Sequence, residues 1–143
     1  RVLFRSVDLK NFLPILNIKK ITFINLQYTD EDEKIKAFNK LHDTNIYNIN
    51  NIDKFNDIDC LASLIASCDL IVTSSNATAH IAGALGVKTL LLAPFGKGKI
   101  WYWYEENQTS LWYPSIKVFN QLPNSSWENA VREIKNEIEK KIT

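Results

Sequence analysis

The sequence contains no methionine and only two cysteines among its 143 residues. Because it also opens on Arg1, we expect a piece cut from a longer protein. Cys60 and Cys68 lie on one expected helix, whose rise puts them about 12 Å apart, too far for a disulfide. The sequence therefore predicts buried free thiols and a reducing compartment, which we take to be the cytoplasm.

A large net charge and long apolar runs are also missing. The formal net charge is +1, so no overall field favours nucleic acid or an anionic membrane as a partner. No apolar run approaches the roughly 20 residues of a membrane-spanning helix, so we expect no transmembrane segment. No group of His, Cys and Asp residues has the spacing of metal ligands, which predicts that no metal is bound. The chain is 45% hydrophobic, and its size suits one domain, residues 1–143.

Short apolar strands alternate with helices along the chain. Apolar runs and turn signals predict strands at 21–27, 45–49, 70–73, 88–93 and 116–119. Helical spacing and capping residues predict helices at 8–16, 30–41, 58–67 and 76–85 and a closing helix after Ser125, with an irregular stretch at 94–115. This alternation predicts an α/β fold: a Rossmann-like, doubly wound and mainly parallel sheet with helices on both faces.

The stretch TSSNATAH at 73–80 joins an expected strand to an expected helix. Ligands of doubly wound sheets bind at such strand ends, and the first turn of a helix presents unpaired N–H groups that suit phosphate. None of the four glycines lies here, so the corner is neither a Walker loop nor a G-x-G-x-x-G turn. We expect Asn76 and His80 on one helical face, near the mouth of the site. Ser74 or Ser75 is the expected helix cap, and plain capping and anion binding both stay open.

The longer stretch LIASCDLIVTSSNATAHIAGALGVKTLLLAPFG resembles the core of the glycosyltransferase family 9-like domains that follow tetratricopeptide repeats in bacterial proteins. These domains are related to the lipopolysaccharide heptosyltransferases and, more distantly, resemble the O-linked N-acetylglucosamine transferases. Further family segments are similar, in the same order, to RSVDLKNFLPIL at 5–16, FINLQ at 23–27 and SLWYPSIKVFNQ at 110–121. The resemblance covers nearly the whole chain.

This resemblance implies the C-terminal half of a GT-B glycosyltransferase, which holds a nucleoside-diphosphate sugar donor without a metal. The donor diphosphate would sit at the start of the helix at 76–85. Carried over by position, the implied donor-binding residues are Arg5, Gln27, Ser75, Asn76, Ala77, Thr78, His80 and Lys97. The implied partners are the N-terminal GT-B domain, which normally carries the family's catalytic base, and tetratricopeptide repeats in the same polypeptide. No catalytic residue is assigned within this chain, and alone it is not expected to turn over substrate.

Family residues near the sugar are replaced in this sequence. Ser75 stands where the family has an aspartate, and Tyr102 stands where it has an arginine. Lys97 or Lys99 is the candidate for the missing positive charge, although an ammonium lacks the fork geometry of a guanidinium. These losses leave open a second interpretation, a catalytically degenerate module that serves protein interaction. A third is a flavodoxin-like or other phosphate-binding α/β protein. The six aromatic residues at 101–113 are expected either to stack on a sugar or to pack on the sheet.

Overall fold

A computed structural model describes residues 7–27, 32–96, 103–124 and 126–142 of the chain. It begins with a short 3-10 helix, Leu9–Phe12, that runs into α1, Leu13–Leu16. As expected, Asp8 caps this start, because its side chain accepts a hydrogen bond from the backbone N–H of Lys10 at 2.9 Å. Pro14 lies in the first turn of α1, where its missing N–H costs nothing.

The strands form two sheets. β1, Phe23–Asn25, pairs in parallel with β2, Ile46–Asn48, and the two are connected through α2, Asp32–His42. The second sheet has the order β3-β4-β7-β6-β5. Its parallel part consists of β3, Ile71–Ser74, β4, Thr89–Ala93, and β7, Ile116–Asn120. The remaining helices are α3, Ile58–Ala66, α4, Ala77–Ala84, and α5, Glu128–Ile142.

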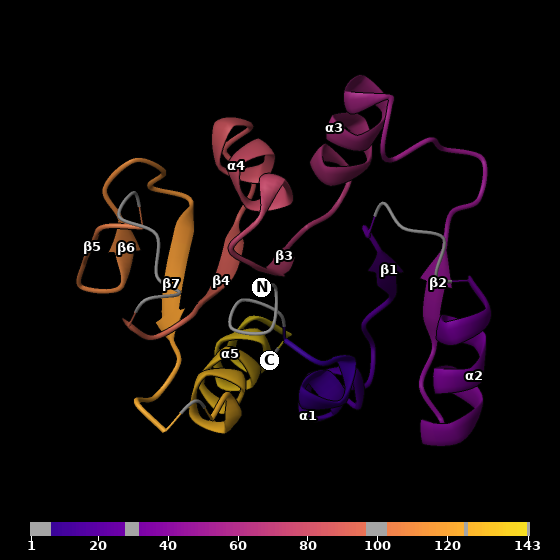
Figure 1. Ribbon diagram of the computed structural model, residues 1–143, viewed down its shortest axis with the longest axis horizontal. Helices are drawn as coiled ribbons and strands as arrows, with labels where there is room; N and C mark the ends of the chain where they lie inside the picture. The colour runs from indigo at the N-terminus through magenta and orange to yellow at the C-terminus, as the bar shows by residue number, and fades with distance from the viewer. Residues whose placement is uncertain (1–6, 28–31, 97–102, 125, 143) are drawn as a thin grey trace.

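Helices cover both faces of the larger sheet, which confirms the expected layering (Figure 1). All of β4 is buried, and its side chains alternate between two cores. Leu90 and Leu92 pack in the cluster that contains α1 and α5, whereas Leu91 and Ala93 pack in the cluster that contains Ala79 of α4. A third cluster joins α3, α4 and β3. β4 is therefore the middle strand of the parallel part of the sheet, between β3 and β7.

The smaller sheet continues the same layer. Phe23 of β1 packs against the cluster on the α5 side, and Leu26, directly after β1, packs against the cluster on the α3 side. Since neighbouring residues of a strand point to opposite faces, β1 lies in the plane of the larger sheet. No ladder joins β1 to β3 within the described residues. The sheet is thus interrupted between β1 and β3.

The stretch at 94–115, expected to be irregular, contains a short hairpin. β5, Glu105–Glu106, pairs antiparallel with β6, Thr109–Ser110, and β6 pairs antiparallel with β7. Asn107 and Gln108 form the turn with φ values of +49° and +64°. Two consecutive left-handed residues are typical of a type I′ turn, whose twist matches that of the flanking strands. The hairpin was not predicted because its turn contains no glycine. The antiparallel pairing of β6 with β7 makes the larger sheet mixed, with its parallel part in β3, β4 and β7.

The buried faces of α3 and α5 largely follow the apolar spacing of the sequence. In α3, Leu61 and Ile65 are buried as expected, but Ile58 is 64% exposed, because it lies at the first position of the helix. Cys60 and Cys68 are free, as expected, but both are half-buried and not buried, and Cys68 lies beyond the end of α3. The apolar positions expected for the closing helix are buried, namely Trp127, Ala130, Val131, Ile134 and Ile138, whereas Ile142 at the end of α5 is 41% exposed. Ser125, the expected start of its capping box, lies outside the described residues.

Within the described parts of the chain, no helix is long and apolar enough to cross a membrane.

Candidate functional site

The candidate site begins where β3 ends and α4 starts. Asn76 is the cap residue of α4, in place of the expected Ser74 or Ser75. Its side-chain oxygen accepts from the backbone N–H of Ala79 at 3.3 Å and from the Thr73 hydroxyl at 3.2 Å. Asparagine takes this position because its short amide reaches the third helical N–H while its own backbone stays extended. The third amide of the helix is therefore satisfied by the protein itself.

The two amides before it stay open. The N–H groups of Ala77 and Thr78 have no carbonyl one turn earlier to bond, and no acceptor among the described residues takes them up. Asn76 and Ala77 are exposed and Thr78 is half-exposed. Because β3, β4 and β7 are parallel, this helix start lies at the edge of the sheet where all three strands end. Two of the expected amide donors thus face solvent at the expected edge.

An aromatic wall flanks these amides. The His80 ring stacks on Trp103 with centroids 4.7 Å apart, and its Nδ1 lies 3.1 Å from the Tyr113 hydroxyl. The indole N–H of Trp103 donates to Ser75 Oγ at 2.7 Å. His80 was expected to point to the mouth with Asn76, but its ring instead packs on the fully buried Trp103. The contacts with Trp103 and Tyr113 therefore set the orientation of the imidazole, which the helical spacing alone does not predict.

A glycine permits this arrangement. A Cβ on Gly83 would lie 2.5 Å from Cγ of Tyr113, a distance that real side chains do not tolerate. The bare backbone of α4 therefore lets the Tyr113 ring come close enough for its hydroxyl to reach His80, which lies almost one turn earlier in the helix. The small-residue stretch of α4 thus serves the site as well as the packing on the sheet.

The other expected donor residues are placed as follows. Gln27 is exposed, and its backbone N–H donates to Asn25 Oδ1 at 3.0 Å. No hydrogen bond of the described residues joins the Gln27 side chain to the start of α4. Arg5 and Lys97 lie outside the described residues, as do Lys99 and Tyr102. The structure therefore brings Ser75, Ala77, Thr78 and His80 together.

Trp103 and Tyr113 are partners of His80 that the sequence alone does not indicate. Of the described aromatic residues at 101–113, Trp103 is buried and Tyr113 half-buried, whereas Tyr104 and Trp112 are exposed. Trp103 lies 23 positions after His80 in the sequence, so no local spacing reveals the contact. The useful signal was Gly83 inside a helix, which indicates that a bulky group approaches the backbone.

Burial lowers the pKa of His80 below its ordinary value of about 6.5. In the unfolded chain the imidazole takes up a proton near pH 6.5, but in the folded chain only at lower pH, so protonation favours unfolding. We predict that the free energy of unfolding falls as the pH drops below about 6.5 and that His80→Gln reduces this fall. Urea unfolding of both proteins at pH 7.5 and 5.5 measures it. Equal pH dependence of the two proteins would show that His80 is not the group responsible.

A comparison with curated proteins finds a relative that matches most of the chain. The chain is 32% identical over 115 residues to Protein FlbA of Caulobacter vibrioides. The match covers 80% of this chain but only 19% of FlbA, so the chain spans about a fifth of that relative's length. No protein-family model and no solved structure matches the chain.

Proposed function

We propose that this domain binds a nucleoside-diphosphate sugar and serves as the donor half of a GT-B glycosyltransferase. The observation that carries the proposal is the pair of open amides at Ala77 and Thr78. The start of a helix carries a partial positive charge, and its unpaired N–H groups bind phosphate oxygens directly. During transfer these donors stabilise the charge that builds on the leaving diphosphate, without a metal.

The side chains around the amides support the same assignment. Ser75 accepts a hydrogen bond from Trp103, so its oxygen is held in place and its hydroxyl hydrogen is left to donate to a ligand. We assign this donor to the sugar, in the position where the family resemblance has an aspartate. Arg5 and Lys97 or Lys99 would add positive charge. Within the described residues, no group of three His, Cys, Asp or Glu side chains is arranged to hold a metal.

Strand order is a second line of support. In a dinucleotide-binding sheet, the strands numbered by their order in the sequence lie side by side as 3-2-1-4-5-6. The observed orders β2-β1 and β3-β4-β7 fit the positions 3-2 and 4-5-6, with position 1 vacant between β1 and β3. In the family resemblance, the first strand of the donor domain precedes Arg5. We propose that this strand pairs with β1 and β3, between which the described residues form no ladder, and that an N-terminal GT-B domain and tetratricopeptide repeats belong to the same polypeptide.

Calorimetric titration tests the proposal. We expect UDP, GDP or ADP to bind with a dissociation constant below about 1 mM, because a diphosphate on a helix start retains most of its affinity without the sugar. The matching mononucleotide should bind at least about tenfold more weakly, since it lacks the second phosphate. Absence of heat with all three diphosphates at millimolar concentration would contradict the proposal.

One observation favours a second function, a non-catalytic module that binds another protein. Tyr104, Leu111 and Trp112 are 59%, 63% and 63% exposed and lie close together in the sequence. In this case the changes Ser75→Asp and Tyr102→Arg in the longer protein should restore no transferase activity. Sugar transfer by the unaltered longer protein would exclude this second function.

A further inference from the structure

A cavity of about 200 Å³ lies at the edge of the larger sheet where β4 and β7 begin, opposite the edge where α4 starts. Its walls come from the residues that lead into β4 and β7 and from the end of α5. The charged side chains that line it are Lys88, Lys117, Lys141 and Glu137. Because β4 has five residues, the strand separates this cavity from the start of α4 by about 16 Å. It is therefore distinct from the proposed donor site.

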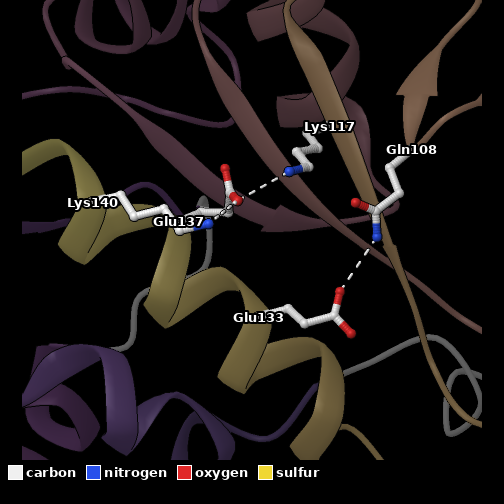
Figure 2. Close-up of polar contacts among 5 residues, drawn as sticks. All are labelled: Gln108, Lys117, Glu133, Glu137 and Lys140. Atoms are coloured by element: carbon white, nitrogen blue, oxygen red, sulfur yellow. Dashed lines mark hydrogen bonds and ion pairs between the residues drawn. The ribbon is translucent and has the colours of Figure 1, made fainter.

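The charges of this cavity do not balance. Glu137 is bonded to Lys117 at 3.1 Å and to Lys140 at 3.5 Å, and Figure 2 shows both ammonium groups converging on the one carboxylate. Lys88 and Lys141 have no carboxylate partner among the described residues. Burial and then repulsion from Lys88 lower the pKa of Lys141, the charge of Glu137 opposes this shift, and Lys117 adds to it. Lys88, Lys117 and Lys141 all line the same cavity. The hydrogen bond from Lys117 lowers the pKa of Glu137, which keeps that carboxylate charged.

Hydroxyl groups accompany these ammonium groups. Ser115 lines the cavity, and its buried Oγ has no hydrogen-bond partner among the described residues. Thr109, also in the lining, is exposed. A buried hydroxyl without a partner is unfavourable until an acceptor reaches it. The lining therefore has a surplus of positive charge and an unused donor.

We propose that this cavity binds a single phosphoryl-sized oxyanion, held by Lys88, Lys117 and Lys141. An oxyanion supplies the negative charge that Glu137 alone does not provide, and an acceptor for Ser115. The cavity is smaller than the roughly 300–1,000 Å³ of sites for drug-sized ligands, so it suits one charged group and not a whole nucleotide sugar. The group is either a free ion or the phosphoryl group of a phosphorylated side chain.

Titration with inorganic phosphate, followed through the backbone amide signals by NMR, tests the proposal. We expect saturable shifts at Lys88, Thr89, Ser115 and Lys117, and at least about tenfold weaker binding to Lys88→Gln/Lys141→Gln. The variant Lys40→Gln/Lys135→Gln loses the same charge elsewhere and should bind phosphate normally. A second titration with O-phosphoserine separates the sources, because tighter binding than phosphate indicates a phosphorylated side chain and weaker binding a free ion.

A gain of affinity provides the sharper check. Glu137→Gln removes the one carboxylate of the lining and should bind phosphate several-fold more tightly. Shifts confined to Ala77 and Thr78, or equal affinity of the two double variants, would overturn the proposal. The same holds if Glu137→Gln binds phosphate more weakly while it remains folded.

Discussion

We expect Trp103→Ala to lower the free energy of unfolding by about 3–5 kcal/mol, the range for truncation of a large aromatic residue in a core. Trp103 is fully buried and packs with Leu91, Ile116 and Val118. Its loss opens a cavity and also removes the donor to Ser75 Oγ. Urea denaturation, followed by far-ultraviolet circular dichroism, measures this effect.

Two further variants separate packing from the hydrogen bond. Trp112→Ala removes an indole that is 63% exposed and should change the stability by no more than about 0.5 kcal/mol. Trp103→Phe keeps most of the buried area and loses the N–H donor, so it should cost about 1–3 kcal/mol. If Trp103→Ala and Trp112→Ala cost the same, the aromatic wall is not part of the core.

The second large effect concerns ligand affinity. We expect Ala77→Asp to weaken nucleoside diphosphate binding about 100-fold, or by about 2.7 kcal/mol. Its carboxylate would lie beside the open amides of Ala77 and Thr78, where it repels the phosphates and competes for the donors. The same change suits the fold, because a negative charge in the first turn stabilises a helix by about 0.3–1 kcal/mol. Calorimetry and thermal unfolding of one preparation measure both effects.

The neutral variant Ala77→Asn is the matched control, because it has nearly the same shape without the charge. It should lose less than about tenfold in affinity. Since Ala77 is exposed, neither change disturbs the core. Equal losses for the two variants would mean that bulk and not charge excludes the ligand, and undiminished binding to Ala77→Asp would place the diphosphate elsewhere.

The layers of the fold were predictable because they depend on local patterns. Apolar runs such as Thr89–Ala93 are what a strand buried on both faces requires, and the spacing of Ala130, Ile134 and Ile138 defines the buried face of α5. Local rules also placed α4 directly after β3. Local patterns do not predict that β1 and β3 lack a ladder, because strand pairing depends on segments that are distant in the sequence.

The site was only partly predictable, for a physical reason. Helix geometry is local, so the open amides of Ala77 and Thr78 follow from the position of the cap. The contacts of His80 with Trp103 and Tyr113 depend on how a long connection returns to the sheet, which no spacing encodes. Asn76 is the cap because α4 begins at Ala77, whereas Ser75 accepts a hydrogen bond from Trp103, which is likewise a contact between distant segments.

The most direct test of the central claim is the response of two backbone amides to a diphosphate. Isotope-labelled protein titrated with UDP, GDP and ADP should show the largest saturable NMR shifts at the N–H groups of Ala77 and Thr78. The amide of Ala79, which Asn76 already occupies, should shift less. If these nucleotides bind and the Ala77 and Thr78 signals do not move, the start of α4 is not the diphosphate site.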